Sequence, residues 1–104
     1  MWRYFVLLFP LCSFAQSNFN VELLDNWTDD NIVSGFNDLR YSDCWGYASN
    51  GAEYAMLGST EGVHFFQISD ENQFQFIDFV EGNYSHPSVV HRDIKIYRNY
   101  AFMV

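Results

Sequence analysis

The stretch that decides the fold is Asp43-Cys-Trp45-Gly-Tyr47-Ala-Ser-Asn50-Gly51-Ala-Glu-Tyr54-Ala-Met-Leu57. Its pattern returns near the end of the chain as Asp93-Ile-Lys95-Ile-Tyr97-Arg-Asn99-Tyr100-Ala-Phe-Met-Val104. The aspartates are 93 − 43 = 50 positions apart, whereas the Tyr-Ala pairs are 100 − 54 = 46 apart, which predicts a tighter turn in the second copy. A period in this range is typical of repeat architectures. Because the second copy stops in mid-strand, we expect the chain to be the front part of something longer.

Short runs with strand composition follow one another after about residue 40. The expected strands are residues 43–48, 53–58, 63–68 and 74–80, separated by segments rich in Gly, Asn, Asp and Glu. Asn50-Gly51 is a hairpin signal, because both residues accept the positive φ of a two-residue turn. These runs predict a four-stranded antiparallel meander, and residues 81–87 then connect it to the second copy.

Both faces of the later strands carry apolar side chains. In the third strand, Val63 and Phe65 are expected to lie opposite Phe66 and Ile68. In the fourth strand, alternation predicts that one face carries Phe74, Phe76 and Val80. The opposite face is expected to carry Ile77 and Phe79. A meander with one solvent-exposed face would alternate apolar and polar residues along each strand. Two apolar faces favour a propeller blade, which packs against neighbours on both sides, over a sandwich sheet.

Five spaced pieces of the sequence carry a family resemblance. They are Asp43-Cys-Trp45-Gly46-Tyr47, Gly51-x-Glu53-Tyr54-Ala55, Gly58-x-x-x-Gly62, Phe65-Phe66-Gln-Ile68-Ser-Asp70 and Arg92-Asp93-Ile94-Lys95-x-Tyr97-x-Asn99-Tyr100-Ala101-Phe102. Together, from about Asp25 onward, they resemble the opening repeats of the choice-of-anchor B family. The resemblance implies an extracellular propeller of LVIVD-type repeats with a C-terminal anchoring segment and no established enzymatic activity. This chain departs from the family pattern where Asp70 is not followed by proline and where His91 replaces an aromatic residue.

Residues 1–15 have the features of a secretory signal peptide. Arg3 supplies a positive charge, residues 4–11 are mostly apolar, and Ser13 and Ala15 are small residues before a cleavage site. The apolar run is well short of the ~20 residues that a transmembrane helix needs. The sequence therefore predicts export to the cell surface or the extracellular space, without a transmembrane span.

The expected organisation is that of an all-β, partial β-propeller. Residues 1–15 form the signal peptide, 16–40 a leading segment with an edge strand, 41–82 the first blade, and 83–104 a linker with a truncated second blade. A propeller has at least four blades. One blade and part of another leave apolar faces and strand edges open, so we expect this chain alone to aggregate.

Charge and cysteine content exclude several classes of protein. Without residues 1–15 the chain keeps four basic and thirteen acidic residues, a formal charge of 4 − 13 = −9. Such a chain repels phosphate backbones, which argues against nucleic-acid binding. Cys44 is then the only cysteine, so no intrachain disulfide forms and stability depends on the apolar core. We expect Cys44 to be buried in the first strand.

The candidate binding residues gather around the start of the second copy: His86, His91, Arg92 and Asp93. Two histidines and one acid are a loose pattern for a metal, and no cysteine lies nearby, so no metal or other cofactor is predicted. The alternative for Arg92 and Asp93 is a structural contact between their side chains. His64 lies in an apolar strand and is expected to be a satisfied core histidine.

No catalytic residue is predicted. Ser59, Ser85 and Ser88 lack a strand-turn-helix elbow, and Cys44 has no cationic neighbour in sequence. The recurring positions favour structural roles, such as bonding strand backbone, and they are Asp43, Trp45, Tyr47, Tyr54, Asp93, Tyr97 and Tyr100.

The sequence therefore predicts a non-catalytic, adhesion-like display or binding protein whose loops contact a surface protein or a glycan. Two alternatives remain open. The first is an exported hydrolase or metalloenzyme whose catalytic residues lie in blades beyond this chain. The second is a glycan-binding propeller, which aromatic side chains exposed on one set of loops would favour.

Overall fold

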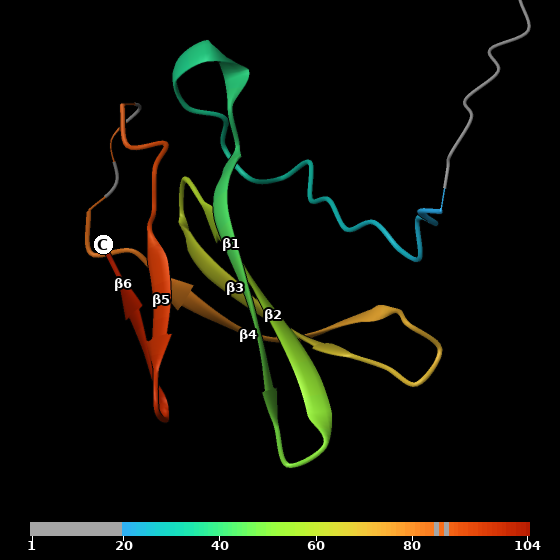
Figure 1. Ribbon diagram of the computed structural model, residues 1–104. Helices are drawn as coiled ribbons and strands as arrows, with labels where there is room; N and C mark the ends of the chain where they lie inside the picture. Colours follow the sequence, from blue (N-terminus) through green and yellow to red (C-terminus); the bar gives the residue numbers. More distant parts are fainter. Residues whose placement is uncertain (1–19, 85, 87) are drawn as a thin grey trace, which may run out of the picture.

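The fold is all-β, as the sequence predicts, with one turn of 3-10 helix (Figure 1). The computed structural model describes residues 20–84, 86 and 88–104, so the predicted signal peptide lies outside the described residues. The elements are η1 (Phe36–Asp38), β1 (Tyr41–Ser49), β2 (Ala52–Ser59), β3 (Gly62–Ile68), β4 (Phe74–Glu81), β5 (Ile94–Tyr97) and β6 (Tyr100–Met103). In these residues no helix has both the length and the apolar character needed to cross a membrane.

The strands form two open sheets. Sheet 1 is a four-stranded antiparallel meander in the order β1-β2-β3-β4, and sheet 2 is the antiparallel hairpin β5-β6. The four predicted strand runs all fall within β1 to β4, and β5 lies beside β1 (Figure 1). The second copy of the repeat is therefore placed against the first.

The two hairpins have turns of the same length. Asn50 and Gly51, with φ of 52° and 79°, connect β1 to β2, and Arg98 and Asn99 connect β5 to β6. The prediction of a tighter second turn was wrong, because the second copy lacks two residues in each strand instead. An even number of residues per strand preserves which face each side chain occupies. Tyr97 accordingly pairs with Tyr100 as Tyr47 pairs with Tyr54.

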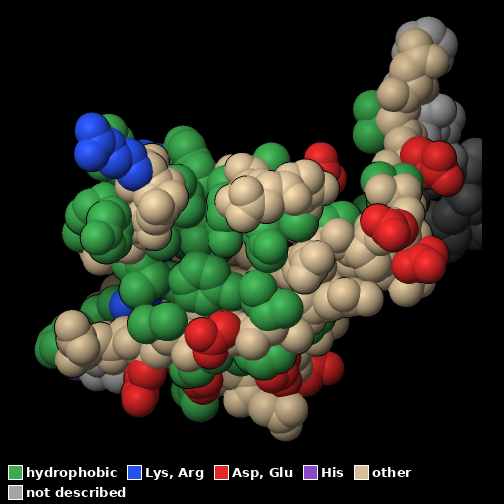
Figure 2. All heavy atoms as spheres, turned by 90° about the horizontal axis from the view of Figure 1, so that it is seen from below, with side chains coloured by type: hydrophobic (Ala, Val, Ile, Leu, Met, Phe, Trp, Pro, Cys, Tyr) green, Lys and Arg blue, Asp and Glu red, His purple; other side chains and the backbone are tan. Residues whose placement is uncertain are grey.

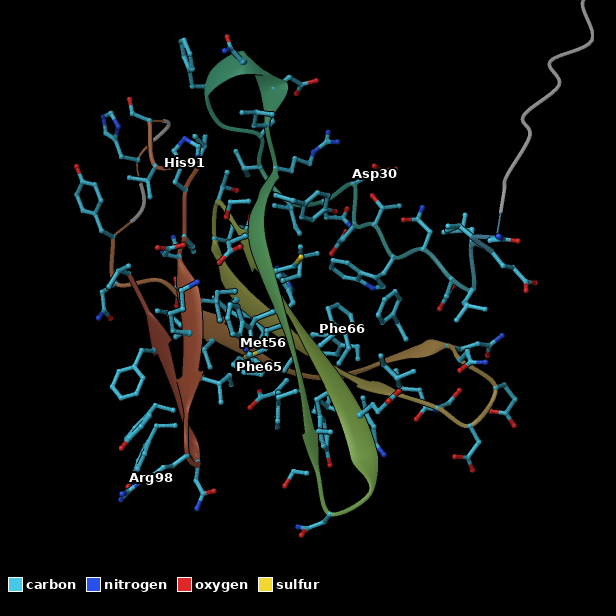
Figure 3. The ribbon with its side chains drawn as sticks, viewed as in Figure 1. Asp30, Met56, Phe65, Phe66, His91 and Arg98 are labelled. Atoms are coloured by element: carbon cyan, nitrogen blue, oxygen red, sulfur yellow. The ribbon has the colours of Figure 1, made fainter. Side chains whose placement is uncertain are left out.

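Both faces of sheet 1 are covered, at least in part, as its apolar composition predicts. On one face Met56 and Val63 pack with Ile94 of sheet 2, and all three side chains are at most 1% exposed. On the other face Trp27 of the leading segment packs against Phe66, with ring centroids 4.8 Å apart. Figure 3 shows Phe65 and Phe66 in these two different settings, Phe65 beside Met56 and Phe66 on the side of the leading segment.

The predicted faces of β4 were wrong for two residues, Phe79 and Val80, and Val80 pairs with Val63 on the face opposite to Phe76. Phe65 pairs with Asp78 while Phe66 pairs with Phe76, so Ile77 is an extra residue, a β-bulge, in β4. A bulge shifts the alternation of side chains by one position. As a result Phe79 shares the face of Phe76, and both rings lie near His64.

The leading segment forms no strand within residues 20–40, where an edge strand was expected. Its polar groups are bonded to sheet 1 through side chains instead. The Asp25 carboxylate accepts the N–H of Phe74 at 2.7 Å, and the Tyr41 hydroxyl accepts the N–H of Asp29 at 2.7 Å. These bonds hold Trp27 on the sheet without any strand ladder.

Candidate functional site

The junction between the two sheets begins at a bulge in β1. Tyr41 pairs with Ser59 and Cys44 with Leu57, so β1 has one more residue than β2 between these pairs. A bulge redirects side chains away from the regular ladder. Here Ser42 Oγ accepts the N–H of Arg92 at 3.1 Å, and Asp43 Oδ2 accepts the N–H of Ile94 at 3.0 Å.

Asp43 therefore bonds the backbone of the following copy. Its N–H donor, Ile94, comes directly after Asp93, which is the counterpart of Asp43. The bond from the Ile94 N–H is the main cause that lowers the pKa of the Asp43 carboxyl, and the positive charge of Lys95 adds to it. The Lys95 ammonium also lies 4.4 Å from the ring centroid of Trp45, its own counterpart in the first copy.

Arg92 holds the junction at a second point. Its Nε donates to the carbonyl of Ser59 at 2.7 Å, and its Nη2 donates to the carbonyls of Thr60 at 3.0 Å and Tyr84 at 3.3 Å. The alternative, a contact between the side chains of Arg92 and Asp93, is not formed, because these carbonyls bind the guanidinium. Within the described ranges the one ion pair joins Arg40 to Asp30.

The four predicted binding residues do not converge on one centre. His91, Arg92 and Asp93 line an open groove of about 600 Å³ together with Asp43, and His86 is not part of its wall. The His86 ring stacks near Tyr84, and its Nδ1 accepts the N–H of Ser88. Among the residues described, no three His, Cys, Asp or Glu side chains gather as a metal site would require.

The repeat tyrosines mark the opposite end of the junction. Tyr47 and Tyr54 are half-buried and stack with ring centroids 4.8 Å apart and an interplanar angle of 15°. Their counterparts Tyr97 and Tyr100 are 63% and 69% exposed. Between the first hairpin and the turn of the second lies a second groove of about 580 Å³, here called the hairpin groove.

Figure 3 labels residues at both ends of sheet 2, with His91 at one end and Arg98 at the turn of the hairpin. Seen from the side of the turns, Figure 2 shows hydrophobic side chains gathered across the surface between the hairpins. Residue patterns alone did not single out this groove. The difference of four residues between the copies is the available signal, but it fits a tighter turn as well as it fits shorter strands.

A serine and a histidine lie close together in sheet 1, as a nucleophile and its base would. Ser59 and His64 form a close pair, with Oγ and Nε2 3.0 Å apart. Ser59 is fully buried and His64 is 6% exposed, so a substrate has no access to this hydroxyl. Burial lowers the pKa of the His64 imidazole, against the opposing charges of Glu61 and Asp29. The pair therefore acts as a satisfied core element.

Cys44 was expected to be buried, and this prediction was wrong because the residue is exposed. It lies on the β1 face opposite to Trp45, and the leading segment does not cover it.

Comparisons with protein-family models, curated proteins and solved structures gave no match. The family resemblance of the sequence therefore stays a prediction.

Proposed function

We propose that this chain is the front part of an extracellular β-propeller repeat protein that displays or binds other molecules and is not an enzyme. The supporting observation is that contacts between the sheets join matching positions of the two copies. Ser42 bonds the backbone of Arg92, 50 positions later, and Asp43 bonds the residue after Asp93. Contacts that join equivalent positions of successive units are what a stacked repeat requires.

The exposure of the second copy supports the same proposal. In the first copy the face that carries Tyr47 and Met56 is directed toward sheet 2 and is partly covered by Ile94 and Ile96. The corresponding face of the second copy exposes Tyr97, Tyr100 and Phe102 by 55% or more. In a propeller a following blade would cover this face in the same way.

The proposed location and the non-catalytic role depend on the sequence together with the buried state of Ser59. The signal-peptide pattern of residues 1–15 supports export, and the proposed partners are a surface protein or a glycan. The hydroxyl nearest to a histidine base is enclosed, as described above, which favours binding over hydrolysis.

The experiment that tests the proposal is a structure of the protein from its complete reading frame, with protease accessibility on intact cells as the test of location. We expect further units in which each first-strand aspartate accepts the N–H of the next unit. A non-repeating domain against β5-β6 would contradict the propeller. A His, Asp and Glu cluster converging near the ring axis would support the exported enzyme instead.

A further inference from the structure

The hairpin groove exists because the second hairpin is shorter than the first. Beyond Tyr47 the first hairpin continues through Ala48 and Ser49, whereas the second turns at once through Arg98 and Asn99. The tip of the first hairpin therefore extends past its neighbour. The space left beside it is the groove, which Ala48 and Ser49 of β1 line on one side and the turn residues Arg98 and Asn99 on the other.

The walls of the groove combine a flat aromatic surface with neutral polar groups. The stacked rings of Tyr47 and Tyr54 form one side, and Met56, Phe65 and Ile96 form an apolar floor. Phenol hydroxyls, the Ser49 hydroxyl and the Asn99 amide surround this surface. Pockets that bind small ligands have this combination of an apolar lining with a few polar groups that set orientation, and their usual size is about 300 to 1,000 Å³.

The charges of the groove narrow the class of ligand. Arg98 is the one charged residue among those that line it, and no Asp, Glu, Lys or His is among them. The Arg98 guanidinium lies 5.3 Å from the ring centroid of Tyr97, on the side of the hairpin that faces away from sheet 1 (Figure 3). The tyrosine wall and the apolar floor of the groove thus carry no charged side chain, although the chain as a whole has a formal charge of −8. An uncharged ligand with one apolar face and a polar rim suits these walls.

We propose that the hairpin groove binds a neutral sugar, with the C–H face of one ring on Tyr54, which Tyr47 supports by stacking, and its hydroxyls bonded to Ser49 and Asn99. Tyrosine is suited to this role because its ring is apolar and its hydroxyl forms hydrogen bonds. The inference rests on the proposed function, which it deepens by naming a ligand class and a site.

Titration calorimetry with the full chain tests the proposal, using linear neutral hexasaccharides of glucose, mannose and N-acetylglucosamine as probes. We expect at least one probe to bind, and Tyr54→Ala to weaken binding about tenfold or more, as the loss of an aromatic contact predicts. Tyr97→Ala is the matched control, because Tyr97 is the counterpart of Tyr47 and does not line the groove. It should leave the affinity unchanged.

A second variant tests the groove without removing a buried ring. Inserting Ala-Ser after Tyr97 and Ala-Glu before Tyr100 gives the second hairpin the strand length of the first. The filled groove should lose sugar binding while hydrogen exchange still protects the Ile94 amide that Asp43 holds. Sugar binding that survives this insertion would overturn the proposal, and so would failure of all three probes. The exchange measurement tests the repeat architecture independently of sugar binding. Loss of Ile94 protection in the unmodified chain would contradict the repeat architecture, whereas loss of sugar binding alone would not.

Discussion

At the scale of single residues, Arg92 is the side chain on which the junction depends most. Arg92→Met keeps an apolar stem of similar length but removes the donors to Ser59, Thr60 and Tyr84. Carbonyls left without partners in a partly buried place cost about 1–3 kcal/mol. We therefore expect urea denaturation to show a loss of stability of that order.

The matched control is His91→Ala, next to Arg92 in sequence but exposed to solvent. Its effect should stay within about 0.5 kcal/mol, as for most surface substitutions. Equal effects of the two substitutions would show that the guanidinium does not hold the junction.

His64 makes stability depend on pH in a defined direction. Its folded-state pKa lies below the ordinary value of 6.5 because the ring is buried. Between these two values the unfolded chain binds more protons than the folded chain, so the free energy of unfolding decreases as the pH falls below about 6.5. Above that value the contribution is fully present.

The measurement is urea denaturation at about pH 7.5 and about pH 5.5, on the two sides of the histidine titration. His64→Gln retains a hydrogen-bonding group near Ser59 but does not titrate, so its loss of stability between these values should be smaller than that of the unmodified chain. His86→Gln, at an exposed histidine, should follow the unmodified chain. A pH dependence unaffected by His64→Gln would rule out this origin.

At the scale of elements, the β1 bulge requires a glycine on the neighbouring strand. A Cβ added to Gly58 would lie 2.8 Å from Ser42 Oγ and 3.2 Å from Arg92 Cβ. Gly58→Ala should therefore push the two sheets apart and cost about 1–3 kcal/mol, as overpacking does in well-packed sites. Thermal unfolding followed by circular dichroism measures the effect.

Gly46→Ala is the control for this prediction. A Cβ at Gly46 would meet its nearest neighbour, the Tyr54 carbonyl oxygen, at 3.7 Å, an ordinary contact distance. Its cost should be clearly smaller than that of Gly58→Ala. A larger cost for Gly46→Ala would mean that the junction is not tightly packed around Gly58.

Strand positions were predictable because local chemistry determines them. Asn50-Gly51 accepts the positive φ of its turn, and the apolar runs between turn residues fall within β1 to β4. The bulge at Ile77 was not predictable, because a single extra residue leaves no mark on composition. The partners of Arg92 were hidden for a related reason, since they are backbone carbonyls, which every sequence has.

At the scale of the whole molecule, the uncovered face of sheet 2 should cause self-association. Tyr97, Tyr100 and Phe102 are exposed side by side on this hairpin. Exposed apolar patches of this kind promote contacts between molecules. We expect light scattering to show association that increases with concentration, and Phe102→Lys to reduce it.

Phe36→Lys is the control, because Phe36 is 65% exposed on η1, apart from sheet 2. It makes the same chemical change and should leave association nearly unaltered. If both substitutions reduced association equally, net charge and not the face of sheet 2 would be the cause.

Less of the candidate site than of the fold could be predicted. The repeat indicated which positions correspond, and Asp43 does bond the next copy. The hairpin groove depends on where two turns end relative to each other in space. The sequence shows that the second copy is four residues shorter than the first. Only the strand register shows that two residues are missing from each strand of the hairpin. The exposure of Cys44 likewise depends on how far the leading segment reaches.

The bulge at Ile77 also determines how these molecules are able to aggregate. β4 is the last strand of sheet 1, and no other strand of the described residues pairs with its outer edge. A regular edge would template the addition of strands from other molecules, as in amyloid fibrils, whereas a bulge twists the edge and interrupts its hydrogen-bonding pattern. Aggregates of this chain should therefore grow through the aromatic face of sheet 2 and should not increase the fluorescence of amyloid-binding dyes.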